Sequence, residues 1–183
     1  MRLPADAVLM VVDAEGVNGD PLEDAGGRPE ADSKMAALVA AWRAEGLPVV
    51  HVGPQSASAA RPRDGETVIA RCAMSAFVRT RLEERLDELG VTTLVLCGAL
   101  ATHALEATAR HAGDLGYRVF VVADACRAAG AVDLRGRSWP AEDVRALTLA
   151  HLKGETATVV DAATALQAAA TARARQRRKA GRA

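Results

Sequence analysis

Short apolar runs alternate with longer amphipathic stretches along the whole chain, and this alternation constrains the fold more than any other feature. The apolar runs predict β-strands over residues 7–12, 48–52, 67–70, 92–97, 118–123 and 157–160. The amphipathic stretches predict helices over 33–45, 76–89, 101–115 and 140–153, and an alanine-rich helix follows the last strand. Parallel strands need crossover connections, which helices usually make. The sequence therefore predicts an α/β fold, Rossmann-like and doubly wound, with a mostly parallel six-stranded sheet and helices on both faces.

Residues that start and stop helices support these boundaries. Ser33 and Ser75 are suited to cap the amino ends of the first two predicted helices. Gly46 and Gly90 follow the same two helices and are suited to end them. Pro140 is well placed in the first turn of a later helix.

Length and composition favour one domain. The chain has 183 residues, half of them apolar, so it can bury one full core, which we assign to residues 1–170. Aromatic residues make up only 3% of the chain, which argues against a surface that stacks nucleic-acid bases. The final residues, 171–183, are predicted to form a basic, disordered tail, because the last eleven positions carry six positive charges and no acid: Arg173, Arg175, Arg177, Arg178, Lys179 and Arg182.

The sequence also limits where the chain works and what it binds. No apolar run approaches the roughly 20 residues of a membrane span, and no targeting segment is recognisable, so we predict a cytoplasmic protein with no membrane partner. Cys72, Cys97 and Cys126 are odd in number and lack metal-ligand spacing, so they are predicted to be free thiols.

The fold class predicts where a site would lie. Ligands of open parallel sheets bind beyond the carboxyl ends of the strands, near the point where the strand order reverses. Asp13, Arg71 and the segment after Cys97 follow three of the predicted strands, so we expect them at one rim of the sheet. The loops 20–29 and 54–64, rich in Gly, Pro, Ser and Asp, could serve as lids.

Four segments give a resemblance to a known family. They read VLMVVDA (8–14), IARCAMSAF (69–77), LVLCGALATHALEATARHAGDLGY (94–117) and VVADAC (121–126). In this order and at these strand ends they resemble the isochorismatase-like (cysteine hydrolase) superfamily. The resemblance implies frequent homodimers or tetramers. We expect a small-molecule substrate or ligand and no cofactor. It also implies a site made of an Asp after the first strand, a Lys four residues before Ser-Ala-Phe, and usually a Cys six residues after the glycine of the central strand.

Carried onto this chain, the resemblance implies a degenerate site. Asp13 matches the Asp, Arg71 takes the position of the Lys, and Ala104 takes the position of the Cys nucleophile. Glu15 stands where a Gln often follows the Asp. Ala104 cannot attack a carbonyl, yet backbone amides near Ala99, Leu100 and Ala104 could still hold an anion, and His103 could face the pocket or cap the helix. The Asp-x-His and paired-His pattern of zinc-binding nicotinamidases is absent, so no metal is predicted.

Three hypotheses about function follow. The first is an isochorismatase-like hydrolase of a small, anionic metabolite that works without a cysteine nucleophile, through acid/base chemistry of Asp13, as true isochorismatases do when they hydrolyse a vinyl ether. The second is a catalytically inactive relative that binds a metabolite or a partner protein. The third, which we favour least, is a thiol hydrolase that uses Cys72 or Cys97. In each case Arg71 could grip a substrate acid or pair with Asp13 or Glu15.

Overall fold

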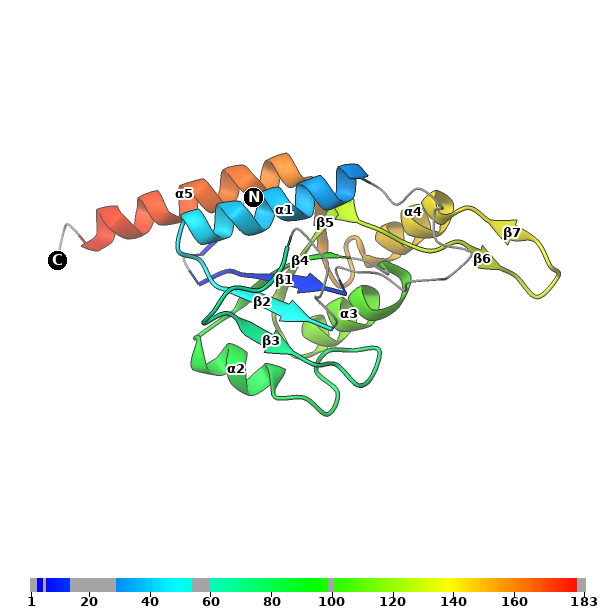
Figure 1. Ribbon diagram of the computed structural model, residues 1–183, viewed down its shortest axis with the longest axis horizontal. Coiled ribbons are helices and arrows are strands. Elements are labelled where there is room, and N and C mark those ends of the chain that lie inside the picture. Colours follow the sequence, from blue (N-terminus) through cyan, green and yellow to red (C-terminus); the bar gives the residue numbers. More distant parts are fainter. Residues whose placement is uncertain (1–2, 5, 14–28, 54–59, 99–100, 181–183) are drawn as a thin grey trace.

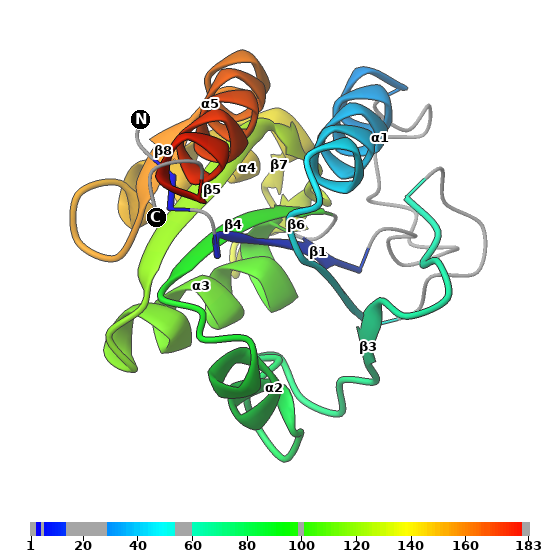
Figure 2. The same ribbon diagram turned by 90° about the vertical axis from the view of Figure 1, so that its left-hand side faces the viewer.

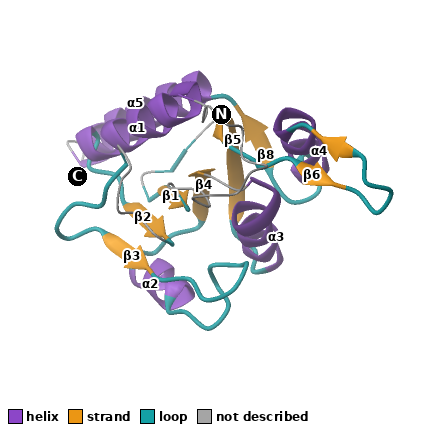
Figure 3. Cartoon of the chain, turned by 45° about the vertical axis from the view of Figure 1, so that its right-hand side comes forward, coloured by secondary structure: helices purple, strands orange, loops and turns teal. Residues whose placement is uncertain are grey.

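The computed structural model describes residues 3–4, 6–13, 29–53, 60–98 and 101–180, and its centre is a six-stranded sheet (Figures 1 and 3). The strand order is β3-β2-β1-β4-β5-β8 and every neighbouring pair is parallel. The bounds are β1 Val8–Val12, β2 Val49–Val52, β3 Thr67–Ile69, β4 Thr93–Gly98, β5 Arg118–Cys126 and β8 Thr158–Val160. The predicted fold class is confirmed, and the predicted strands lie within three residues of the observed ones at each end.

The central strands are apolar throughout because both faces of the sheet are covered. Successive side chains of a strand point to opposite faces. Val8, Met10 and Val12 of β1 accordingly join one core cluster, and Leu9 and Val11 join the other.

Helices cover both faces of the sheet (Figure 2). On one face lie α1 (Pro29–Ala44) and α5 (Ala162–Ala180), which both contribute buried residues to one core cluster. On the other face, the second core cluster contains residues of α2 (Leu82–Glu88), α3 (Glu106–Asp114) and α4 (Ala141–Leu152). A short π-helix, η1 (Ala101–Leu105), leads into α3. This two-sided cover is the doubly wound arrangement that the alternation predicts.

Two predicted helix starts are wrong. The first helix begins at Pro29, four residues before Ser33, because proline is already set for a first helical turn. The second begins at Leu82 rather than at residue 76, since Arg79 adopts a left-handed backbone, with φ of 57°, that a helix cannot contain. Ser75 still caps a turn, because its Oγ accepts a hydrogen bond of 3.3 Å from the Phe77 N–H.

The sequence prediction misses one hairpin and shortens one helix. Strands β6 (Ala131–Val132) and β7 (Ser138–Trp139) pair antiparallel and extend away from the body beyond α4 (Figure 1). Helix α5 continues to Ala180, across the boundary predicted at residue 170, whereas a disordered segment was expected from residue 171. Alanine and arginine are both strong helix formers, which accounts for this extension.

No helix in the described part of the chain is both long and apolar enough to cross a membrane.

Candidate active site at the sheet switch point

The strand order reverses between β1 and β4. From β1 the sheet continues to β2 and β3, and from β4 it continues to β5 and β8. Asp13 follows directly after β1, and Gly98 is the last residue of β4. These two positions therefore flank the crevice in which such sheets bind ligands.

Asp13 is buried and its backbone is strained. Its side chain is 2% exposed, and its φ of 46° lies in the left-handed region that few residues other than glycine adopt. The Asp13 N–H donates a hydrogen bond of 2.8 Å to the carbonyl of Val52, so the chain leaves β1 while still paired with β2. Strain of this kind persists only where the surroundings hold the residue in place, and it is often found at functional sites.

Arg71 binds both oxygens of the Asp13 carboxylate. Its Nε donates to Oδ1 at 2.9 Å and to Oδ2 at 2.8 Å, and one terminal nitrogen lies 2.6 Å from Oδ2. The other terminal nitrogen donates to the carbonyl of Ala73 at 3.0 Å. All three guanidinium nitrogens are therefore engaged within the chain, and the Arg71 side chain is 22% exposed. The structure thus brings together the two residues that the resemblance implies, as an internal ion pair.

Gly53 makes room for this pair and was not identified from the sequence. A Cβ atom built on Gly53 would lie 1.9 Å from Asp13 Oδ1 and 3.7 Å from Arg71 Nε. Gly53 also has a φ of +82°, and its N–H donates to the carbonyl of Ile69 at 2.9 Å. No local sequence pattern indicates this contact, because Gly53 and Asp13 meet only when β1, β2 and β3 align.

The segment that carries Arg71 is tied to α3 by contacts that were not predicted from the sequence. Ser75 Oγ lies 2.9 Å from Nδ1 of His111, and the Ala76 N–H donates to Thr108 Oγ1 at 3.0 Å. Both partners are residues of α3, the helix that follows η1. The Ser-Ala-Phe and Ala-Thr-Ala-Arg segments of the sequence are therefore the two halves of one contact.

The remaining predicted site residues lie apart from the pair or outside the described residues. Ala104 is in η1, has no exposed surface and belongs to the core cluster on the α3 face. His103 is exposed. Glu15, Ala99 and Leu100 lie outside the described residues, as do 20–28 and 54–59 of the two predicted lid loops.

Two of the three thiols are unsuited to nucleophilic attack. Cys97 is buried within β4, and burial raises its pKa well above the ordinary value of 9. Cys126 is buried at the end of β5, and burial raises its pKa to about 12. Cys72 is exposed, with its sulfur 3.6 Å from the carbonyl of Val78. The raised pKa argues against Cys97 as the nucleophile of the thiol hydrolase hypothesis, since the thiolate is the reactive form.

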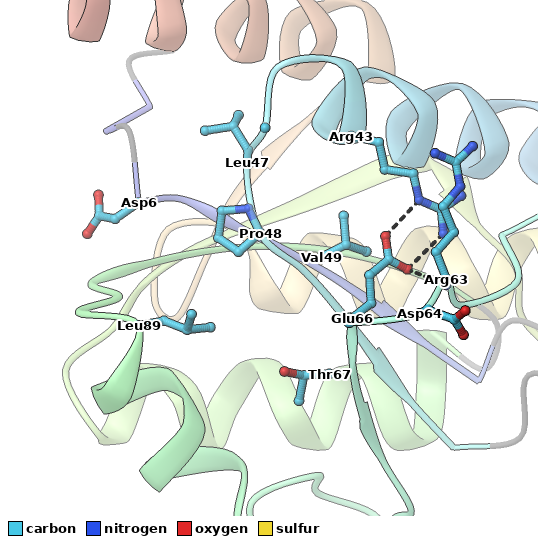
Figure 4. Close-up of a pocket in the computed structure, with 12 residues that line it drawn as sticks. Asp6, Arg43, Leu47, Pro48, Val49, Arg63, Asp64, Glu66, Thr67 and Leu89 are labelled. Carbon is cyan, nitrogen blue, oxygen red and sulfur yellow. Dashed lines mark hydrogen bonds and ion pairs between the residues drawn. The ribbon is translucent and has the colours of Figure 1, made fainter.

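A second carboxylate–arginine cluster lies at the opposite end of the strands, beside a cavity of about 900 Å³ (Figure 4). Glu66 precedes β3, and its carboxylate accepts hydrogen bonds from Arg43 Nε at 2.7 Å and from the Arg63 N–H at 2.9 Å. His51 Nε2 lies 2.8 Å from the same carboxylate. Because this cluster sits at the amino ends of β2 and β3, it is remote from the switch point. Among the described residues, no three His, Cys, Asp or Glu side chains are grouped to hold a metal ion.

Comparisons with known proteins identify the family of this chain. Residues 52–164 match the model of the isochorismatase domain. An isochorismatase family protein of Bacillus subtilis, YddQ, is 34% identical over 149 residues, which cover 72% of this chain and 82% of YddQ. A solved structure from Chromobacterium violaceum, named as a candidate hydrolase of the isochorismatase family, is 34% identical with a TM-score of 0.84, covering 93% of this chain and 97% of that one. An isochorismatase from Pseudomonas putida is 28% identical with a TM-score of 0.80, covering 90% and 92%. The chain described here therefore belongs to the isochorismatase family.

Proposed function

We propose that this chain is a hydrolase of a small, anionic metabolite that uses Asp13 as its acid/base group and has no cysteine nucleophile. The observation that carries the proposal is the Asp13–Arg71 pair, which lies at the switch point of the sheet. Family membership supports a hydrolase, and Ala104 at the implied nucleophile position supports chemistry without a thiol. On this proposal the site is degenerate with respect to the thiol members of the superfamily.

The ion pair supports a specific role for each partner. Both oxygens of Asp13 accept hydrogen bonds from Arg71, an arrangement that fits the ionised carboxylate. An ionised carboxylate accepts a proton, so Asp13 would activate water as a general base. A substrate anion that drew Arg71 towards itself would release one oxygen of Asp13 for this role. Backbone amides around Ala99, Leu100 and Ala104 would stabilise the negative charge that develops on the substrate.

A specific observation favours the second candidate, a binding module without catalysis. Asp13 is 2% exposed and already paired, and Ala104 is buried in the core. A buried carboxylate that stays bound to arginine would serve stability rather than chemistry. In that case Arg71 would not exchange partners when a ligand arrives.

The test compares two variants that each neutralise one carboxylate of an arginine pair. Wild type, Asp13→Asn and Glu66→Gln are screened against vinyl ethers, amides and esters, each in an anionic and a neutral form. We expect wild type to hydrolyse at least one anionic compound, and Asp13→Asn to reduce turnover by about 10² to 10⁴-fold. Glu66→Gln is the matched control, because Glu66 pairs with Arg43 at the opposite end of the strands. This variant should keep the turnover of wild type at temperatures where it is folded.

Two outcomes would reject the hydrolase proposal. If wild type binds an anion by calorimetry and hydrolyses none of the compounds, the chain is a binding module. If Asp13→Asn turns over substrate as fast as wild type, the carboxylate is structural. We further propose a cytoplasmic location and, as the resemblance implies, a homodimer or tetramer.

A further inference from the structure

The β6–β7 hairpin presents an apolar side chain at its tip. Leu134 is fully exposed there, and Val132 and Trp139 on the hairpin strands are also exposed. The hairpin extends away from the body beyond α4 (Figures 1 and 3). Exposed apolar residues gathered in one place often mark an interaction surface.

The turn that carries Leu134 is held rigidly. Oδ1 of Asp133 accepts hydrogen bonds from the backbone N–H groups of Arg135 and Arg137, at 2.9 and 3.0 Å. The Gly136 N–H donates to the Asp133 carbonyl at 2.9 Å, and the Arg137 guanidinium lies 3.9 Å from the centre of the Trp139 ring. Leu134 is therefore displayed on an ordered turn, so little conformational entropy would be lost when it binds.

A cavity of about 530 Å³ lies at the root of the same hairpin, and its lining is mainly apolar. Its walls include Val132 and Trp139 of the hairpin with Val144 and Leu147 of α4. Leu147 is 58% exposed. Leu134 is not among the residues that line this cavity, although its neighbour Asp133 is.

The charges of the tip and the cavity are opposite. Arg135 beside Leu134 is exposed and makes no ion pair within the described part of the chain. Asp143, which lines the cavity, is exposed as well, and its carboxylate has no ion pair among the described residues. One surface thus carries an apolar tip with a positive charge and an apolar cavity with a negative charge.

We propose that this surface joins two copies of the chain in a two-fold dimer, in which Leu134 of each copy enters the cavity at the hairpin root of the other. Two hairpins laid antiparallel about a two-fold axis bring each tip to the other's root. Arg135 of each copy then meets Asp143 of the second copy. A patch that contains both a projection and its matching cavity is self-complementary, as a two-fold interface requires.

The experiment measures the mass of the full chain by analytical ultracentrifugation over a range of concentrations. Wild type is expected to form a dimer or a larger even-numbered assembly. Leu134→Asp should lower the affinity of the two copies for each other by about 100-fold. Each of the two buried leucines accounts for roughly a tenfold gain in affinity. Leu89→Asp is the matched control, because Leu89 is an exposed leucine at the end of α2, away from the hairpin. Thermal melts should show that both variants are folded.

A charge exchange tests the register of the two copies. Arg135→Asp and Asp143→Arg should each weaken the assembly, and the double variant should recover most of the lost affinity. A wild-type monomer at every concentration would overturn the proposal. An assembly that is equally strong in wild type and in Leu134→Asp would overturn it too, because the copies would then meet through another surface. A tetramer that falls to dimers in Leu134→Asp would support it.

Discussion

Gly53 and Asp13 are forty residues apart in sequence, and both have a positive φ. Asp13 turns its carboxylate back over the end of β2, into the space where a side chain at position 53 would begin. The carboxylate can therefore reach Arg71 only if position 53 has no Cβ. The Asp13–Arg71 pair thus depends on three residues, although only two of them interact electrostatically.

Gly53→Ala should break the Asp13–Arg71 pair, and Gly65→Ala supplies the control. Both glycines have positive φ, +82° and +88°, but a Cβ at Gly65 meets nothing within 4 Å. Gly65→Ala should therefore cost only the strain of a left-handed alanine, about 1 to 2 kcal/mol. Gly53→Ala should cost about 3 kcal/mol or more, because it also displaces a buried ion pair. Urea denaturation measures both, and equal losses would show that the pair is not held by Gly53.

Glu66 makes the stability of the folded protein depend on pH. Burial opposes ionisation of Glu66, but hydrogen bonds from Arg43, the Arg63 N–H and His51 outweigh it and lower its pKa from 4.5 to about 2. A carboxyl whose pKa is lower in the folded state stabilises the protein above its unfolded pKa. This stabilisation, on the order of 2 to 3 kcal/mol, should be lost as the pH falls from about 4.5 to 2.

Glu66→Gln tests this linkage. The variant should be less stable than wild type at pH 7 and should lose less stability than wild type between pH 4.5 and 2. Chemical denaturation at a series of pH values measures the two slopes. If both proteins lose stability at the same rate as the pH falls, other carboxylates are responsible for the loss.

At the scale of single elements, β4 and β5 keep two of the thiols out of reach. Cys97 and Cys126 lie in these buried strands, and burial raises the pKa of both. Native protein treated with iodoacetamide should therefore carry one adduct, on the exposed Cys72. Mass spectrometry of the digested protein identifies the site.

Cys72→Ser is the control for this labelling. The variant should take up no iodoacetamide in its native state and should keep any hydrolytic turnover of wild type. If iodoacetamide inactivates Cys72→Ser in proportion to labelling, a buried cysteine takes part in the reaction and the proposal of thiol-free chemistry is wrong.

Long apolar strands and their crossover helices could be predicted from sequence, because periodicity reports burial directly. The start of α2 could not, since the left-handed backbone at Arg79 has no sequence signal in a residue other than glycine. The β6–β7 hairpin was missed because its strands have two residues each and are too short to show alternation. Asp13 and Arg71 were predicted to lie at one rim and do meet, whereas the supporting contacts of Gly53 and Ser75 depend on distant elements.

At the scale of the whole molecule, the sheet carries a carboxylate–arginine pair at each end. Asp13 and Arg71 lie at the carboxyl ends of the strands, and Arg43 and Glu66 lie at the amino ends. The two pairs share no residue, so the effects of substitutions on their stability should add. This separation is what allows one pair to serve as a control for the other.

Helix α5 packs on the sheet mainly through alanine methyl groups, and Leu166 adds one partly buried leucine. The buried residues between positions 162 and 172 are all alanine: Ala162, Ala165, Ala168, Ala169 and Ala172. Each buried methyl contributes only about 0.8 kcal/mol, well below a buried leucine. The helix can therefore separate from the body at a lower free energy than the central strands, in a local opening that leaves the rest of the fold intact. In such an opened state Phe120 and Val122 of β5, which share this core, would meet water while the switch point stays closed.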